Sequence, residues 1–340
     1  MQLDDAFYQL LFAVVMFMPV AFLISIVAGP FIIRALRRMK LGQVISADGP
    51  QSHSSKEGTP TMGGLIFIPG LLIPIIPVLE PENPACAKTI ATLCLVLAYA
   101  ALGLVDDYLT IRPIKGVRGI ASKPKAAIQF VIAALFVVWL AMCRPASENA
   151  LIINHVKLLA GVPYYIFAVI FIAGMANFVN ITDGLDGLVS GLTVVLCIAL
   201  GFALIAIKEH RLAPLVFTLA GSLLGFLWYN TNPARVFMGD TGSLAIGALL
   251  PAVALISHME IFLIIAGGVF VLDGLSTAVQ WAVFKYTRIK TGTGRRVFLK
   301  SPVHHHFELC GYPEQTVVVR FWIAGIVAGW LGIMYMWFTR

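Results

Sequence analysis

The chain has 340 residues, of which 59% are hydrophobic and 12% charged, and its mean hydropathy is +0.89. This is more apolar surface than a water-soluble domain of this length can bury, so the composition excludes an ordinary soluble enzyme and indicates an integral membrane protein. The net charge of +7 is accompanied by no nucleic-acid-binding motif, and we expect no nucleic acid among the partners.

Apolar runs long enough to cross a bilayer recur along the whole chain. A helix needs ~20 residues to cross a hydrocarbon core of ~30 Å, and the bilayer admits only helices or closed barrels. Long strand-like alternation is absent, so we predict an all-α membrane protein of about ten transmembrane helices, with residues 1–340 as one polytopic domain. The predicted spans are 8–33, 62–79, 88–105, 126–143, 161–176, 188–207, 213–229, 242–257, 261–284 and 317–338.

Two of these spans contain helix-breaking residues. Pro69, Pro74 and Pro77 fall in the second span, and Gly267 and Gly268 fall in the ninth. Because proline removes a backbone donor and glycine weakens the helix, we expect both spans to be kinked or broken. A bent ninth helix would suit an apolar groove for a long lipid tail.

The loops between the spans predict the orientation. If the spans alternate, eighteen of the 24 lysines and arginines fall on one face and six on the other, which also carries both termini. By the positive-inside rule the first face is cytoplasmic and the termini are periplasmic. The cytoplasmic segments are 34–60, 106–125, 177–187, 230–240 and 285–316.

Five polar clusters fall on this predicted cytoplasmic face. Their agreement on one side of the membrane predicts a single shared site there. The clusters are GTPTMGG at 58–64, GLVDDYL at 103–109, NITDGLDG at 180–187, WYNTNPARVFMGDTGS at 228–243 and SPVHHHFEL at 301–309.

The third cluster continues a polar stripe. Asn177, Asn180, Asp183 and Asp186 recur every three residues and would lie on one side of a helix. Ionisable groups at membrane depth indicate a functional cavity, although a stripe that only pairs with a neighbouring helix remains an alternative. In the fourth cluster, Asp240 lies beside glycines and hydroxyl side chains, which suits a hard cation with oxygen ligands or, alternatively, a helix N-cap.

His304, His305 and His306 are consecutive, and this geometry disfavours zinc. Adjacent side chains diverge by ~100° on a helix and alternate on a strand, so three neighbouring imidazoles do not converge on one ion. Acid/base chemistry or phosphate binding is the functional alternative, and a solvent-exposed run without a role is the other.

Taken in order, these motifs resemble one known family. GTPTMGG, DDY, NxxNxTDGLDGL, FMGDxGSL and PxHHHFEL, extended by DGPQSH at 48–53 and RFWIAG at 320–325, resemble the phospho-N-acetylmuramoyl-pentapeptide-transferases. The wider superfamily of polyprenyl-phosphate sugar-1-phosphate transferases is expected to share the aspartate motifs but not the histidine tract. The resemblance covers about residues 43–320.

The resemblance implies an enzyme of the bacterial inner membrane with a cytoplasmic, Mg²⁺-dependent site. It implies transfer of phospho-N-acetylmuramoyl-pentapeptide from its uridine diphosphate carrier to undecaprenyl phosphate, giving lipid I and uridine monophosphate in peptidoglycan synthesis. A homodimer is also expected by resemblance. The two alternatives are a transferase that uses the acetylglucosamine nucleotide and, from another class, an ion-coupled transporter.

The resemblance also implies residue roles. Asp240 would hold Mg²⁺, with Asp106 and Asp107 binding the metal or the lipid phosphate. Asp106 is a candidate base, although a phosphate already largely ionised at neutral pH does not require one. His304, grouped with these three aspartates as catalytic, would lie with His305 and His306 at the sugar-diphosphate end. The remaining substrate-binding positions would be Lys56, Thr61, Lys125, Asn177, Asn180, Asp183, Asp186, Asn230, Phe237 (stacking on the uracil), Gly239 and Gln280.

Two positions depart from the expected family pattern. Asp273 stands where we expect a glutamate, and its role is open. Lys123 and Lys125 flank Pro124, so either could occupy the family's lysine position, and we predict Lys125.

Overall fold

The computed structural model describes residues 12–39, 41, 58–79, 84–113, 116–153, 156–209 and 211–339, so the predicted substrate residue Lys56 lies outside the described part. The elements are η1 (Ala13–Phe17), α2 (Met18–Arg38), α3 (Gly64–Ile75), η3 (Ile76–Val78), α4 (Pro84–Ile111), α5 (Ser122–Cys143), η4 (Ala146–Glu148), β1 (Ala150–Ile153), β2 (Val156–Ala160), α6 (Val162–Thr182), α7 (Leu188–Ala206), α8 (Ala213–Asn230), α9 (Gly239–Ser257), α10 (Glu260–Ala266), α11 (Gly268–Thr291), α12 (Val303–Leu309) and α13 (Glu314–Thr339).

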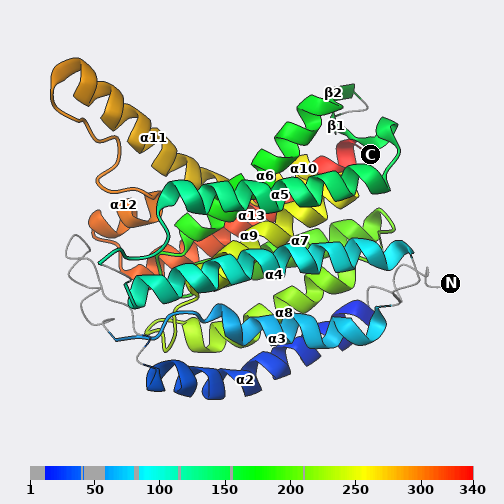
Figure 1. The fold of residues 1–340 in the computed structure, drawn as a ribbon, viewed down its shortest axis with the longest axis horizontal. Coiled ribbons are helices and arrows are strands. Elements are labelled where there is room, and N and C mark those ends of the chain that lie inside the picture. The colour runs from blue at the N-terminus through cyan, green and yellow to red at the C-terminus, as the bar shows by residue number, and fades with distance from the viewer. Residues whose placement is uncertain are drawn as a thin grey trace.

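The helices confirm an all-α, multi-pass membrane protein. In the described residues, eight helices are long and apolar enough to cross a membrane, and α10 with α11 forms a ninth candidate that is bent by 78°. The bend follows Gly267, as the sequence predicted for the ninth span. α11 therefore projects away from the other helices at one end of the bundle (Figure 1).

The second predicted span differs from expectation. α3 continues through Pro69 and Pro74 and has only 12 residues, after which a 3-10 turn carries Pro77. The α-helix thus continues past the first two prolines and gives way to a 3-10 turn within the predicted span. The sequence also missed a short antiparallel hairpin of β1 and β2 in the loop before α6, because strands of four and five residues are too short to show sustained alternation.

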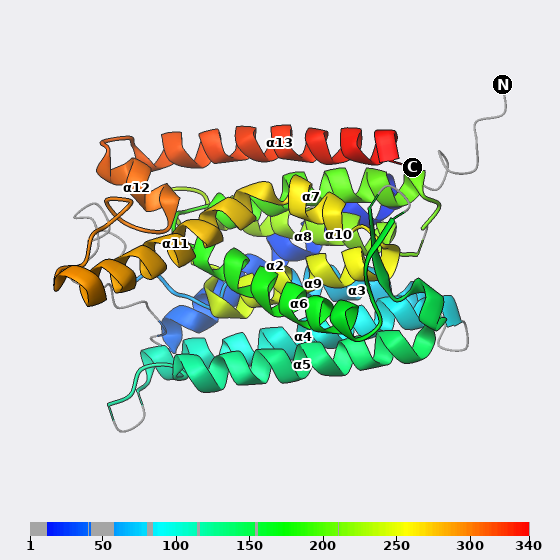
Figure 2. The same cartoon turned by 90° about the horizontal axis from the view of Figure 1, so that it is seen from above.

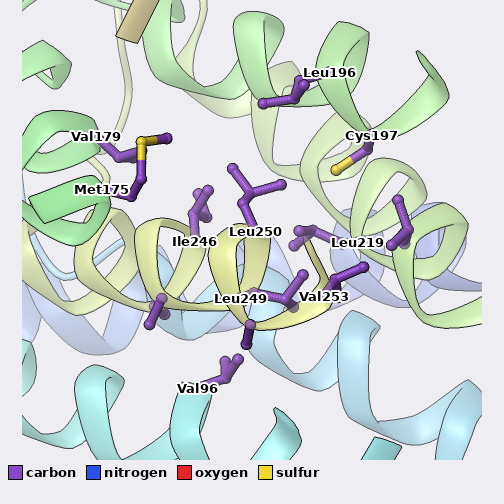
Figure 3. Packing of buried hydrophobic residues seen from close by; sticks show 14 of the residues in the cluster. Val96, Met175, Val179, Leu196, Cys197, Leu219, Ile246, Leu249, Leu250 and Val253 are labelled. Atoms are coloured by element: carbon purple, nitrogen blue, oxygen red, sulfur yellow. The ribbon is translucent and has the colours of Figure 1, made fainter. Parts of the chain in front are cut away.

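α9 is the central helix of the bundle. Every residue from Thr241 to Ser257 is buried, and its apolar side chains meet others from α4, α6, α7 and α8 (Figure 3). Seen from above, α13 lies along one side of the molecule and α4 and α5 along the opposite side, with α9 between them (Figure 2). Because α9 is enclosed, its first turn is held in place by helices from several parts of the chain.

Two glycines let neighbouring helices approach the start of α9. A Cβ at Gly103 of α4 would lie 2.2 Å from the carbonyl oxygen of Asp240, and one at Gly64 of α3 would lie 2.5 Å from the backbone nitrogen of Gly242. No side chain fits in either space, so glycine is required for this packing. The start of α2 and the end of α13 both lie at the other end of the bundle (Figure 1).

Candidate active site

The first turn of α9 is capped by a side chain from α4. Asp107 Oδ1 accepts the backbone N–H of Asp240 at 3.1 Å, and its Oδ2 accepts the backbone N–H and the hydroxyl of Thr241 at 3.0 and 2.7 Å. A helix N-terminus leaves backbone donors unsatisfied and carries partial positive charge, so a buried carboxylate is stabilised there. Asp240 itself makes no capping hydrogen bond, so the N-cap alternative for Asp240 is not what the structure shows.

Gly239 brings this turn against the 60–64 segment. Its φ is +71°, and a Cβ there would lie 2.5 Å from Asp107 Oδ2 and 2.6 Å from Thr61 Oγ1. Backbone hydrogen bonds from Phe237 to Pro60 and from residues 63 and 64 to 237 and 238 hold the two segments together. The predicted site residues Thr61 and Gly239 are therefore neighbours, with Phe237 on the same pair of segments.

Lys125 connects two predicted site aspartates. Its ammonium lies 3.2 Å from Asp106 Oδ2 and also contacts Asp240 Oδ2. Asp106 is held in turn by the backbone N–H of Ile120, at 2.7 Å from Oδ1. Lys123 is exposed, so it is Lys125 that the fold directs toward the carboxylates. A cation therefore lies between Asp106 and Asp240.

The end of α6 supplies the next side chains. Asn180 donates to Asp240 Oδ1 at 2.7 Å and to Ser243 Oγ at 2.9 Å. Asp183, the first residue after α6, accepts the backbone N–H of Gly239. Burial, followed by the nearby carboxylates of Asp240 and Asp107, raises the pKa of Asp183 to about 8.

Asp186 and Asn230 are placed on the other side of the 183–187 turn. Asp186 Oδ2 accepts from Asn232 Nδ2 at 3.1 Å and from the backbone N–H of Ala234 at 3.0 Å. Asn230 Oδ1 accepts the N–H of Gly187 at 3.1 Å. Both side chains thus fix the turn to the loop that follows α8, and the Glu314 side chain also contacts this loop through Asn232, at 3.2 Å.

The three histidines lie on α12 and each has a different partner. His304 is fully buried with its Nδ1 2.7 Å from Asp273 Oδ2, whereas His305 Nδ1 lies 2.6 Å from Glu308 Oε2. His306 Nδ1 accepts the backbone N–H of Leu299 at 3.2 Å. Burial lowers the pKa of His305 below its ordinary value, although the bond to Glu308 acts in the opposite direction. The triplet is therefore not a solvent-exposed run.

Two predicted residues lie away from the aspartates in this structure. Gln280 binds the loop after α11, accepting the N–H of Val297 and of Phe298 at 2.8 and 3.0 Å. Asn177 lies one helical turn before Asn180 and donates to Gln129 Oε1 at 2.6 Å. Their side chains hold protein segments together, and the structure gives neither a contact with Asp106 or Asp240.

Sequence reasoning missed some participants. Asn232 and Glu314 organise the turn next to Asp186; Asn232 lies in the polar cluster at 228–243 but is not among the predicted site residues, and Glu314 lies outside all five clusters. Ser243 and Thr241 had a visible signal, since their hydroxyls flank Asp240 in FMGDTGS.

The predicted metal ligands Asp240, Asp106 and Asp107 are not equivalent. In the described part of the chain, no three His, Cys, Asp or Glu side chains are arranged to share one ion. Asp107 is not available as a third ligand, because both of its oxygens accept hydrogen bonds from the start of α9. Asp240 and Asp106 form the remaining pair, with the Lys125 ammonium between them.

Comparison with known proteins identifies the family of this chain. The family described as Glycosyl transferase family 4 matches residues 89–258, and a phospho-N-acetylmuramoyl-pentapeptide-transferase signature matches residues 56–68. Relatives with the name phospho-N-acetylmuramoyl-pentapeptide-transferase include one from Bacillus pumilus, 41% identical over 95% of this chain and 97% of its own length. Another, from Bacillus velezensis, is 40% identical over the same shares. The chain therefore belongs to the phospho-N-acetylmuramoyl-pentapeptide-transferase family.

Proposed function

We propose that this chain transfers phospho-N-acetylmuramoyl-pentapeptide from its uridine diphosphate carrier to undecaprenyl phosphate, forming lipid I and uridine monophosphate. The observation that carries the proposal is a cation position between Asp106 and Asp240, in a member of a family whose relatives are named for this transfer. Both reactants are anions, so their mutual repulsion must be reduced before the phosphates can meet.

We assign Asp240 and Asp106 as the side chains that would hold Mg²⁺. The fit rests on Lys125, because its ammonium already occupies a position where two carboxylates favour positive charge. Mg²⁺ prefers oxygen ligands and is commonly bound through one or two carboxylates together with substrate phosphates. When bound, it would supply charge stabilisation to the phosphates.

The chain's own residues would then position the reactants. Asp107 keeps the first turn of α9 fixed, and Asn180 orients Asp240 through its 2.7 Å hydrogen bond. Lys125 would donate to substrate phosphate oxygens once its carboxylate partners bind a divalent ion. A positioned ammonium in a partly buried site stabilises phosphate charge more than one in bulk water does.

The apolar tail of the acceptor would reach this position from the bilayer. Leu272, Leu275 and Val279 of the bent helix α11 are exposed, as a lipid-facing surface requires. An apolar groove of about 570 Å³ also runs between α5 and α6, and it begins at Phe130, five residues after Lys125. Either surface could lead a lipid chain toward Lys125.

The proposal places the protein in the bacterial inner membrane with the site facing the cytoplasm. Its basis is the excess of lysine and arginine in the segments that carry the site. The nucleotide would enter from that side, and undecaprenyl phosphate would come from the membrane itself. Pairing with a second copy remains an expectation from the resemblance.

The test is a requirement assay on the purified protein in detergent. Uridine monophosphate should appear from the muramoyl-pentapeptide nucleotide only when Mg²⁺ and undecaprenyl phosphate are both present. Replacing the donor with the acetylglucosamine nucleotide should abolish release; equal or faster release would assign the other sugar. Solute uptake into liposomes without nucleotide turnover would instead support a transporter.

A further inference from the structure

Asp273 and His304 form a fully buried pair between α11 and α12. Both side chains have 0% exposure, and His304 Nδ1 lies 2.7 Å from Asp273 Oδ2. The backbone N–H of His304 also points to Asp273 Oδ1, at 3.3 Å. A carboxylate removed from water needs hydrogen-bond donors. The ring nitrogen that faces Asp273, Nδ1, therefore carries the proton. In a neutral ring this leaves Nε2 unprotonated.

Nε2 of His304 points at the turn between α6 and α7. It is buried and has no hydrogen-bond partner, and a Cβ at Gly184 would lie 2.4 Å from it. His305 Nε2 would lie 3.1 Å from the same Cβ, and the His304 and His305 rings are 4.3 Å apart. The absence of a side chain at Gly184 makes room for these imidazoles.

This turn belongs to the candidate active site. Asp183 at its start accepts the N–H of Gly239, and Gly187 at its end donates to Asn230. The position of the His304 ring therefore affects the distance between Asp183 and the first turn of α9. Asp273 itself lies on the bent helix α11, six residues beyond Gly267.

We propose that Asp273 is a positioning residue that acts through His304. Asp273 fixes the ring orientation and its Nδ1–H tautomer, and the ring supports the Asp183–Gly187 turn that faces Asp240. This inference rests on the proposed function for its activity readout. In metal sites, loss of a carboxylate that orients a histidine costs about 10- to 100-fold in affinity or activity, and we expect an effect of this order here.

Ser276 provides a matched control on the same helix. Its hydroxyl accepts the backbone N–H of Val303 at 3.0 Å and donates to the carbonyl oxygen of Asp273 at 2.6 Å. Ser276→Ala thus removes a contact between α11 and α12 without changing an imidazole partner. If Asp273 only attached α12 to α11, Ser276→Ala and Asp273→Asn would have similar effects.

The first measurement is ¹⁵N NMR of the histidine-labelled full chain in detergent. The wild type should show a neutral imidazole with protonated Nδ1 whose signal is missing from His304→Gln, which separates it from any such signal of His305 beside Glu308. In Asp273→Asn the new amide can donate to Nδ1, so the ring should change to the Nε2–H tautomer. A wild-type His304 already protonated only at Nε2 would overturn the proposal, whatever the enzymatic activity is.

The second measurement is turnover of the nucleotide substrate. Asp273→Asn should lower kcat/KM by about 10- to 100-fold, whereas Asp273→Glu, which retains the carboxylate, should turn over at least several-fold faster than Asp273→Asn. Ser276→Ala should lose less than about fivefold. In the His304→Gln background, Asp273→Asn should add no further loss, because the two residues act as one unit.

Independent losses in the double variant, or equal losses for Asp273→Asn and Ser276→Ala, would show that Asp273 has only a packing role. If no variant or wild-type protein turns over the nucleotide, the proposed function fails, while the NMR result still decides the Asp273–His304 pairing.

Discussion

Buried polar clusters lie at both ends of the helix bundle, and they differ in charge. At the end opposite the site, Tyr164 donates to Glu260 at 2.8 Å, and Arg144 donates to the carbonyl oxygen of Ile256. That cluster contains one acidic and one basic side chain. At the site end, Asp106 and Asp240 contact the Lys125 ammonium, Asp107 caps the first turn of α9, and Asp183 lies near the carboxylates of Asp240 and Asp107.

The difference shows that burial of polar groups does not by itself identify a site. Hydrogen bonds occur in both clusters, as is usual for buried polar groups. In the described part of the chain, the site end places these four aspartates near Lys125, an excess of negative charge that costs stability unless a cation or a positively charged partner compensates it. This contrast predicts opposite outcomes for substitutions at the two ends.

The largest effect is expected at Asp240. Asp240→Asn keeps a group that can accept from Asn180 but removes the charge that would hold a divalent ion, so turnover should fall by about 10³-fold or more. The measurement is release of uridine monophosphate together with the melting temperature of the purified variant. Near-wild-type turnover would remove Asp240 from the metal assignment.

The next effect is expected at Gly239. In Gly239→Ala, the new methyl group would lie 2.5 Å from Asp107 Oδ2 in a backbone with φ of +71°, so we expect a stability loss of about 1–3 kcal/mol and loss of most activity. Gly174→Ala on α6 is the matched control, because nothing lies within 4 Å of its new Cβ. Equal behaviour of the two variants would show that the 239 turn adapts freely.

A smaller, pH-dependent effect is expected at Asp183. Its pKa in the folded protein is about 8 instead of 3.8, so between these values the folded state binds more protons than the unfolded state. Stability should therefore decrease as pH rises from about 4 to about 8, and Asp183→Asn should remove this part of the slope. Thermal unfolding without divalent ions, from pH 5 to pH 8.5, measures it. If the variant keeps the same decrease of stability with pH, other titratable groups cause that decrease.

The smallest effect on turnover is expected at the end of the bundle opposite the site. Tyr164→Phe removes one hydrogen bond to Glu260 and should cost about 1–3 kcal/mol of stability, with turnover within about twofold of wild type because the residue is remote from the site. A thermal melt and the nucleotide assay compare the two properties. A large loss of turnover with an unchanged melt would show that the two ends are functionally coupled.

The sequence predicted the architecture well because its signals are local. The apolar runs, their order and the break at Gly267 depend on composition within short windows, and eight described helices and the bent pair α10–α11 follow them, while the second run gives only the shorter helix α3. Shared placement of the polar clusters was also predictable, since helices that alternate across a bilayer return every second loop to one side. The contacts of Asp107 with Thr241 and of Asn180 with Asp240 join such clusters.

The partner that each aspartate contacts could not be predicted from the sequence. Asp106 and Asp107 are adjacent in the chain, yet one faces Lys125 and the other caps α9. Neighbouring side chains on a helix diverge by ~100°, so their partners depend on which helices pack on either side. The resemblance assigned both residues to the metal, and the packing of α4 on α9 separates them.

By itself, the sequence determined that the chain is a membrane-embedded helical bundle and which family motifs it carries. Both follow from local properties of the sequence, namely hydropathy and the order of the motifs. The tertiary structure decided the roles within the site: that Lys125 bridges Asp106 and Asp240, and that Asp273 pairs with His304. Those partners are 19 to 115 residues apart in the chain. Only the packing of helices brings them within hydrogen-bond distance.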